Sequence, residues 1–352
     1  MSRKRITIYD LAKALNISAS YVSRALNNDP FINEKVKEQV KAKAEELNYQ
    51  QNANAFNLRK GITRTIGVVV PKINEIFFAN AIAGIEEACS KNNYNLIICQ
   101  SAESLKKEIK AVETLIQQNV DCIIISVTME TDSSEHLRRV IENKMHLIQF
   151  DRVRNDVDSF KVENDNLQAA YIAVQHLIQQ GYKKIAHIGG PGFLKVFNDR
   201  KQGYMKAMQE AGLKIPSTYM TEGDLTKTTG HSAATALLSK SNHPDAFFCS
   251  SDNIAFGVLQ AAAAMKIKVP QELGVMGFQN EPFDELLIPS LSSIEQNSKE
   301  LGKHAADIYF NILASAKTPS VPSTEVIQCA LEERDSTRKN VVSATAESAV
   351  SM

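Results

Sequence analysis

The chain lacks the long apolar segments and paired cysteines that membrane and secreted proteins use. No run of 18 apolar residues occurs in its 352 positions, which excludes a membrane-spanning helix. The opening residues MSRKRITIYD contain no apolar core of a signal peptide, so we expect no export. The five cysteines are scattered without a CxxC pair, which predicts buried, reduced thiols in the cytoplasm: Cys89, Cys99, Cys122, Cys249 and Cys329.

Motifs of common catalytic and nucleotide-binding sites are also missing. No GxGxxG follows the first predicted strand, and no Walker loop, HExxH or Gly-x-Ser-x-Gly occurs. The seven histidines are dispersed, and we interpret His187, inside a predicted strand, as a core residue rather than a base. The sequence therefore favours a binding protein over an enzyme, and we expect neither a metal nor a cofactor.

The net charge is zero, but the charges are unevenly placed along the chain. Residues 1–61 hold eleven Lys and Arg against six Asp and Glu, whereas the rest of the chain is acidic by the same margin. A basic head on an acidic body predicts that only the head meets a polyanion such as nucleic acid. A chance excess is the alternative, and charge alone does not decide between them.

The first 50 residues carry the signals of three short helices. Thr7 and Asp10 form a predicted capping box for the first helix, and Asn16 tolerates the left-handed backbone that a turn requires. Ser18 is the predicted cap of a second helix and Asn33 that of a third. The third has an apolar stripe at Val36, Val40, Ala44 and Leu47. Three helices at this spacing are typical of a helix-turn-helix unit.

The second helix has a small and hydroxylic polar face. Its apolar residues fall on one side by spacing, and the other sides carry Ala19, Ser20, Ser23 and Arg24. In a helix-turn-helix unit this helix enters the major groove of DNA, where hydroxyls bond phosphates and an Arg forks onto guanine. A solvated face on an ordinary three-helix bundle explains the same pattern, and the pattern alone leaves both interpretations open.

Four segments of the head resemble the N-terminal domain of the LacI/GalR family of bacterial repressors. They are IYDLA at 8–12, SASYVSRALN at 18–27, ELNY at 46–49 and NANAFNL at 52–58, in the family's order and without a gap. The resemblance, which extends to about residue 333, implies that Ala19, Ser20 and Arg24 read the bases of a DNA operator. It implies phosphate contacts, or packing around them, for Thr7, Tyr9, Ser18, Ser23, Asn27, Asn33, Tyr49 and Asn52. Tyr21 stands where the family usually has Thr.

Residues 52–60, NANAFNLRK, resemble the hinge helix of that family. So short a helix is marginal alone, and we expect it to fold when it pairs with its twin on DNA. The resemblance implies that Leu58 wedges into the minor groove, with Ala55 beside it. An ordinary linker residue packed on the body is the alternative for Leu58.

The length exceeds that of one average domain, and after the head β-branched runs alternate with helical patterns. Strands are predicted at 65–71, 95–100, 121–126 and 146–150, and again at 184–189, 246–249 and 274–278. Helices are predicted near 78–92, 105–118, 132–143, 165–180, 199–212, 228–239 and 252–265. The sequence thus predicts an all-α helix-turn-helix head and hinge helix, followed by an α/β body of two doubly wound lobes with parallel sheets.

Two similar lobes in tandem predict a clamshell with a ligand between them. The resemblance agrees, since the bodies of sugar-binding repressors are similar to periplasmic binding proteins, in which the chain crosses between lobes three times. We place the crossings near 162–164, 290–293 and 320–323. The expected division is a DNA-binding domain at 1–50, a hinge at 51–62, an N-lobe at 63–163 and 292–321, a C-lobe at 164–291 and 322–335, and a disordered tail at 336–352.

Ligands of such sheets lie at the carboxyl ends of the strands. The candidates there in the first lobe are Ile76, Phe77, Phe78, Ser126, Asp151 and Arg152. In the second lobe, Arg200 matches the family's effector-clamping Arg, which takes two ligand oxygens at once; a surface ion pair is the alternative. Asp252 matches a pocket-edge Asp, although a helix N-cap requires an Asp equally.

Two positions depart from the family's usual pattern. Gln279 stands in GFQN at 277–280, where many relatives carry a carboxylate, and Leu225 stands where several have a stacking aromatic. Lys195 and Arg200 are both expected near the pocket. These features lead to the hypothesis that the effector, a sugar or sugar derivative, carries a carboxylate or phosphate.

An effector-controlled repressor accounts for both the head and the body. A stand-alone sugar-binding protein explains only the body, and such proteins need a signal peptide. Two protomers are expected to place two heads on a pseudo-palindromic operator, and the helix at 78–92 is one candidate for the dimer face. The tail lacks leucine heptads, so we expect a homodimer. Induction, corepression and activation are all left open.

Overall fold

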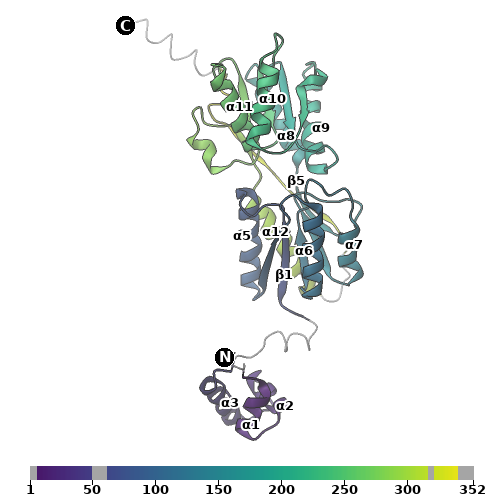
Figure 1. Ribbon diagram of the computed structural model, residues 1–352, viewed down its shortest axis with the longest axis vertical. Coiled ribbons are helices and arrows are strands. Elements are labelled where there is room, and N and C mark those ends of the chain that lie inside the picture. Colours follow the sequence, from purple (N-terminus) through teal and green to yellow (C-terminus); the bar gives the residue numbers. More distant parts are fainter. Residues whose placement is uncertain (1–5, 50–61, 316–320, 340–352) are drawn as a thin grey trace, which may run out of the picture. The chain divides into compact units, whose positions relative to one another are not determined.

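The computed structural model describes residues 6–49, 62–315 and 321–339 of the chain (Figure 1). The chain divides between Thr63 and Arg64 into two compact units, a helical head and an α/β body. The predicted hinge helix, with Asn52, Ala55 and Leu58, lies outside the described residues, as do residues 340–352 of the predicted tail. No helix within the described ranges is long and apolar enough to cross a membrane.

Between residues 6 and 49, the head consists of three short helices: α1 (Ile8–Leu15), α2 (Ala19–Leu26) and α3 (Glu34–Glu46). The predicted capping box is present, because the Thr7 hydroxyl accepts a hydrogen bond from the backbone of Asp10 and the Asp10 carboxylate accepts one from the backbone of Thr7. Asn16 has a left-handed φ of 54°, which turns the chain toward α2. The apolar faces share one core, made of Leu11, Ala12, Val22, Ala25, Ile32, Val40 and Ala44. The predicted helix-turn-helix head is confirmed.

The first lobe is built on a six-stranded parallel sheet of order β11-β5-β4-β3-β1-β2. Its strands are β1 (Thr65–Val70), β2 (Asn95–Gln100), β3 (Cys122–Ile125), β4 (His146–Phe150), β5 (Phe160–Asn164) and β11 (Thr324–Ile327). Val68 and Val70 belong to the core that includes α5 (Ile76–Lys91) and α12 (Ser298–Ala314). Val69 belongs to the opposite core, with α6 (Leu105–Gln117) and α7 (Glu135–Glu142). Because both faces are covered, β1 is an unbroken apolar run, as predicted.

The second lobe repeats this plan with four parallel strands in the order β7-β6-β8-β9. They are β6 (Ile185–Gly189), β7 (Met220–Glu222), β8 (Ala246–Cys249) and β9 (Gly274–Met276), with short 3-10 turns at η1 (Ser217–Tyr219) and η2 (Pro282–Leu286). One face packs against α8 (Asn166–Gln179) and α9 (Lys195–Glu210), and the other against α10 (Lys227–Leu238) and α11 (Asp252–Ala264) (Figure 1). The prediction of two doubly wound lobes is confirmed.

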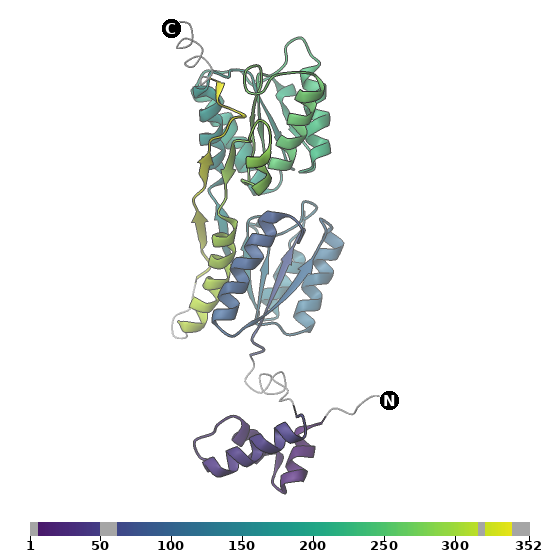
Figure 2. The ribbon, with the colours of Figure 1, turned by 90° about the vertical axis from the view of Figure 1, so that its left-hand side faces the viewer.

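The chain crosses between the lobes three times, but the second and third crossings come later than predicted. Ile294 of β10 (Ser293–Glu295) lies in the core of the second lobe, so the second crossing follows this strand. Strand β11 pairs with β5 in the first sheet, and the chain reaches the second lobe only at β12 (Ala330–Glu332), which pairs antiparallel with β10 (Figure 2). The divisions expected at 291/292 and 321/322 are therefore wrong by several residues. Strands this short carry no periodicity that assigns them to a sheet; backbone pairing does.

The start of the predicted disordered tail is also part of the second lobe. Ser336 and Thr337 are fully buried. The Ser336 hydroxyl donates to the backbone oxygen of Val275, and that of Thr337 contacts His176 at 2.8 Å. Small hydroxylic residues suggested a solvated tail, but here their hydroxyls satisfy buried polar groups, so the prediction of disorder is wrong for 336–339.

Helices α5 and α12 lie side by side and approach each other through two glycines (Figure 2). A Cβ at Gly84 on α5 would collide with the backbone oxygen of Lys299, and one at Gly302 on α12 would collide with that of Ala81. Because the obstructing atoms are backbone atoms, no rotamer change relieves the collision. The packing of the first lobe therefore requires glycine where these helices cross.

Gly84→Ala is expected to destabilise the body by about 1–3 kcal/mol, because the added methyl forces the two helices apart. Urea unfolding followed by circular dichroism measures this change. The matched control is Ser90→Ala, on an exposed position of the same helix, which is expected to leave the midpoint unchanged. An unchanged midpoint for Gly84→Ala would show that the helices are not held at this separation.

Three carboxyl groups are buried together in the second lobe. Asp252 and Asp284 are fully buried, and Glu281 is nearly so. Asp252 accepts hydrogen bonds from the Ser293 hydroxyl at 2.6 Å and from the backbone of Glu281 at 3.0 Å. Burial, together with the charge of Asp252, raises the pKa of Asp284 to about 9 and the pKa of Glu281 to about 7. Near neutral pH, Asp284 is thus an uncharged acid beside Asp252.

Asp284→Asn is expected to stabilise the chain selectively at alkaline pH. The folded protein keeps the Asp284 proton to a higher pH than the unfolded chain does, so stability falls as the pH rises from about 4 toward about 9. The amide has no such proton, so the variant should gain about 1 kcal/mol or more near pH ~8 and little near pH ~4. Urea unfolding at both pH values measures the difference, with Glu285→Gln on the exposed neighbour as control. An equal gain at both pH values would contradict the assignment.

Candidate functional site

The exposed side of α2 presents hydroxyls and one guanidinium. Ser18 caps this helix by accepting a hydrogen bond from the backbone of Tyr21 at 3.1 Å. Ser20 and Arg24 are exposed, whereas three other predicted contact residues are half-buried: Ala19, Tyr21 and Ser23. Val22 lies in the core. The face predicted to read bases is therefore at the surface of the head.

Arg24 is oriented by an acidic residue that the sequence analysis did not single out. Its Nε donates to Oδ2 of Asp29 at 2.8 Å, and the other carboxylate oxygen of Asp29 accepts the backbone N–H of Phe31 at 2.9 Å. The terminal amino groups of Arg24 make no hydrogen bond with the described residues, and its side chain is 48% exposed. Asp29 thus holds one edge of the guanidinium and leaves the forked end toward solvent.

Four other predicted contact residues support the backbone of the head. Thr7 and Asn33 cap α1 and α3 through their side chains. Asn27 donates its side-chain amide to the backbone oxygen of Ser23 at 2.7 Å. Tyr49 packs against the core of the head. These positions are close to the helix termini, where phosphate groups approach helix-turn-helix units.

Two aromatic side chains are exposed on the described part of the head. Tyr9, which was predicted as a contact residue, is 73% exposed, and Phe31, which was not, is 87% exposed. Phe31 follows Asp29 in the loop between α2 and α3, so the same carboxylate that orients Arg24 also fixes this loop.

A cleft with about 270 Å³ of empty space, part of it open to solvent, separates the two lobes. Seven predicted effector residues line it: Phe77, Phe78, Asp151, Arg152, Arg200, Leu225 and Gln279. Four residues that were not predicted also line it: Glu75, Val196, Phe197 and Gln296. The carboxyl ends of β1, β4 and β9 lead into this cleft, as expected for doubly wound sheets.

The wall from the first lobe is built around Arg152, which is only 4% exposed. Its Nη1 donates to both carboxylate oxygens of Glu103 at 2.8 and 3.0 Å, and its Nε lies 3.9 Å from Asp151. Burial raises the pKa of Asp151, although Arg152 and Arg200 oppose this shift. The buried charge of Arg152 is therefore compensated by Glu103 and Asp151, two carboxylates of the same lobe.

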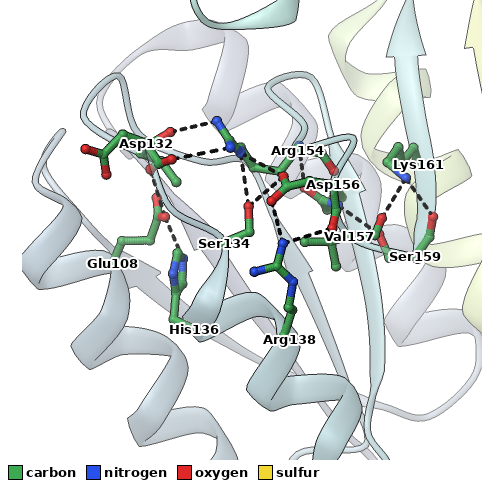
Figure 3. A network of polar contacts seen from close by, with 12 residues as sticks. Glu108, Asp132, Ser134, His136, Arg138, Arg154, Asp156, Val157, Ser159 and Lys161 are labelled. Atoms are coloured by element: carbon green, nitrogen blue, oxygen red, sulfur yellow. Dashed lines mark hydrogen bonds and ion pairs between the residues drawn. The ribbon is translucent and has the colours of Figure 1, made fainter.

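A polar network fixes the loops that carry these residues (Figure 3). The Nε of Arg154 donates to the Ser134 hydroxyl at 3.0 Å and to Asp156 at 3.1 Å. In the same network, buried Glu108 contacts His136 at 2.8 Å and accepts the backbone N–H of Thr128 at 2.6 Å. These hydrogen bonds connect the loop after β3 to the loop after β4. Because Arg152 lies in the second of these loops, the network fixes its position.

The wall from the second lobe is built around Arg200, which is 3% exposed. Its Nε donates to the amide oxygen of Asn166 at 2.9 Å, its Nη1 donates to the backbone oxygen of Ser250 at 2.7 Å, and its guanidinium lies 3.7 Å from the ring centre of Phe278. Burial lowers the pKa of Arg200 to about 10, and the charge of Asp151 opposes that shift. Arg200 is a pocket residue and not a surface ion pair.

Aromatic rings complete the cleft. Phe77 and Phe78 meet edge to face with ring centres 5.2 Å apart. The ring of Phe197 lies 5.6 Å from the guanidinium of Arg152 and 5.8 Å from that of Arg200. Phe197 and Val196 belong to the first turn of α9, one turn before Arg200. Their spacing from Arg200 was a signal in the sequence, but the helix was predicted to begin only at residue 199.

Lys195 does not line the cleft, contrary to the prediction. Its Nζ contacts Asp199 at 2.6 Å and Glu163 of β5 at 3.1 Å. Because α9 begins at Lys195 itself, the side chain lies beside the acidic residue one turn later and bridges to the first lobe. Lys195 therefore connects the two lobes through an ion pair.

Three further predicted residues also lie away from the cleft lining. Ile76 is 38% exposed at the start of α5, where Phe77 and Phe78 point inward instead. Ser126 is fully buried behind the wall, with its hydroxyl 3.3 Å from Asp151. Asp252 is in the buried carboxyl cluster, and Ser251 is the residue that caps α11.

The described lining of the cleft combines charged, amide and aromatic side chains. Its described lining residues include no Ser, Cys or His. Within the described ranges, no group of three His, Cys, Asp or Glu is placed to hold a metal ion. Two guanidinium groups, two carboxylates, two amides and three phenyl rings suit a small molecule with both a polar rim and a ring face.

Comparison with known proteins gives the same division of the chain. Residues 7–52 match the family described as bacterial regulatory proteins of the lacI family. Residues 63–335 match the family described as periplasmic binding proteins and sugar binding domain of the LacI family. The chain is 31% identical over 304 residues to the ribose operon repressor of Escherichia coli strain K12, a match that covers 86% of this chain and 91% of that one.

Two solved structures share the fold. The transcriptional regulator CelR in complex with cellobiose has a TM-score of 0.72 and 25% identity, covering 94% of this chain and 100% of that one. The lac repressor dimer bound to operator and an anti-inducer has a TM-score of 0.82 and 21% identity, covering 95% and 99%. With both of its parts matched in order, the chain belongs to the LacI family of bacterial regulatory proteins.

Proposed function

We propose that the chain is a transcriptional repressor that binds a pseudo-palindromic operator as a homodimer and is controlled by a small sugar or sugar derivative held between its lobes. The observation that carries this proposal is the oriented guanidinium of Arg24 on the exposed face of α2, in the same chain as a cleft lined by charges and rings. Its place of action is the cytoplasm, where operator DNA is, and it performs no catalysis.

The head supplies sequence recognition. Ser20 and the forked end of Arg24 are exposed on α2, so this helix can enter the major groove with a guanine-binding group at its outer surface. Asp29 restricts the guanidinium before DNA binds, which reduces the rotamer entropy lost on binding. The hinge helix with Leu58 as a minor-groove wedge is part of the proposal.

The body supplies effector recognition. The lining of the cleft combines charged groups, amides and aromatic rings, which suits a small ring-shaped molecule that carries several hydroxyl groups. Phe77, Phe78 and Phe197 offer faces for a sugar ring, while Arg200, Asp151 and Gln279 offer donors and acceptors for its hydroxyls. Cellobiose in the CelR complex and the name of the ribose operon repressor support a carbohydrate.

Arg200 is the residue that favours an anionic effector. Both hydrogen-bond partners of Arg200 are neutral, so a carboxylate or phosphate on the effector would compensate a buried charge. The second cation expected there, Lys195, is engaged with Glu163 and Asp199. Because Arg152, the other guanidinium of the cleft, is already paired with Glu103, the hypothesis of an anionic effector rests on Arg200, and a titration against both classes of sugar decides it.

Effector and operator are coupled through the position of the lobes. Lys195 and Glu163 join the lobes beside the cleft, and Arg200 interacts electrostatically with Asp151 of the opposite lobe. A ligand that changes these contacts changes the arrangement of the first lobes in the dimer and hence the pairing of the hinges. Reciprocity then requires the operator to change effector affinity by the same factor.

Arg24→Ala is expected to weaken binding to a duplex selected from a random pool by about ten- to a hundredfold, because one base contact is lost. Asp29→Asn, which keeps Arg24 but releases its Nε, should cost about three- to tenfold by the same reasoning. Gel shifts on selected and random duplexes measure both. Glu45→Gln, exposed on α3, is the control. An equal loss on random duplex would make Arg24 a phosphate contact.

Arg200→Lys is expected to lower effector affinity by about tenfold or more, because an ammonium cannot replace the fork held by Asn166 and Ser250. Calorimetric titration with D-ribose, D-glucose, D-glucuronate and glucose 6-phosphate first identifies the class that binds. Gln209→Ala, exposed on the same helix, is the control. Unchanged affinity in the Lys variant would place the effector elsewhere.

A further inference from the structure

A second cavity lies in the second lobe, between α9 and the edge strand β7. It contains about 710 Å³ of empty space, part of it open to solvent. Among the described residues that line it and the cleft, only Phe197 is common to both. The ring of Phe197 is thus the wall between two separate spaces, and nothing in the proposed effector chemistry uses the second one.

The floor of this cavity is His187, which is 3% exposed. Its ring is stacked between Tyr204 and Phe248 at centroid distances of 5.4 and 5.0 Å. Its Nδ1 lies 3.0 Å from the backbone oxygen of Phe248. Since a carbonyl only accepts, Nδ1 carries the proton. Burial lowers the pKa of His187 to about 4, so the ring is neutral and Nε2 is a lone-pair acceptor.

The Nε2 atom of His187 has no hydrogen-bond partner among the described residues, and it faces Gly189. A Cβ at Gly189 would lie 2.7 Å from this Nε2 and 3.4 Å from the hydroxyl oxygen of Ser250. That hydroxyl is itself buried without a partner. Glycine at this position therefore leaves the Nε2 lone pair of His187 uncovered on the side of the cavity.

The rim of the cavity has a balanced pair of charges. Lys201 on α9 contacts Glu222 on β7 at 3.1 Å, and the other oxygen of Glu222 accepts the backbone N–H of Gly192 at 3.1 Å. Ser217 and Thr221 add hydroxyl groups to the lining. An anionic ligand would be repelled by the Nε2 lone pair of His187 and by the charge of Glu222. A cationic ligand would be repelled by Lys201. A ligand hydroxyl, which both donates and accepts, suits every one of these groups.

We propose that this cavity is a second ligand site, which binds a small neutral polyol through a hydroxyl that donates to Nε2 of His187. The ligand lies between α9 and β7, with its remaining hydroxyls on Lys201 and Glu222. The site is separate from the effector cleft and does not depend on the function proposed for that cleft.

Nitrogen-15 NMR of the histidine rings tests this proposal on the full chain. With glycerol, D-glucitol and myo-inositol as probes, the His187 Nε2 resonance is expected to move upfield in a saturable way, as its lone pair accepts a hydrogen bond, while Nδ1 stays in place. Inorganic phosphate is expected to leave both resonances unchanged. No shift with any of the three polyols, or a shift with phosphate alone, would overturn the proposal.

Two variants show which space holds the probe. Thr221→Trp fills the cavity from β7 and should abolish the Nε2 shift, whereas Gln279→Leu alters the effector cleft and should leave it intact. The opposite pattern would place the polyol in the cleft and refute a second site. His187→Phe keeps the aromatic stack and removes the acceptor, so saturation-transfer signals of the bound polyol should be lost, with thermal unfolding as the check on folding. Retention of those signals would also refute the role of His187.

Discussion

The buried charge of Arg200 is the constraint around which the body is arranged. A guanidinium with 3% exposure must be compensated, yet its two hydrogen-bond partners, Asn166 and Ser250, are neutral. Its compensation comes from the ring of Phe278 and from Asp151 across the cleft. Arg152, by contrast, has Glu103 in its own lobe. The second lobe therefore carries a cationic wall that is completed only when the first lobe, or a ligand, faces it.

The proposed coupling of effector and operator requires lobes that are rigid and a connection between them that is not. Rigidity comes from helices in direct backbone contact, as at Gly84 and Gly302, and from the network around Arg154 that ties two loops together. The connection is three extended crossings, one of which continues from β11 in the first sheet to β12 in the second lobe.

The head shows a similar arrangement on a smaller scale, because the groups proposed to contact DNA are oriented by other residues of the head. Three short helices with a small core need strong local signals, and the side-chain caps at Thr7, Ser18 and Asn33 provide them. Asp29 accepts hydrogen bonds from both the Arg24 guanidinium and the backbone of the following loop, so the orientation of Arg24 is coupled to that of the loop. The surface proposed to contact DNA is thereby ordered within the head itself.

The sequence by itself determined the head and the alternation of strands and helices, because caps, periodicity and β-branched runs act over a few neighbouring residues. It also identified most of the cleft, since strand ends are local features and Arg200 matched a family position. Tertiary structure alone decided the rest. Lys195 forms an ion pair with Glu163 instead of lining the cleft, Asp252 belongs to a buried carboxyl cluster, and β11 pairs with β5 in the first sheet. Each depends on a partner at least 29 positions away in the chain, and no local pattern records which distant group a side chain or strand will meet.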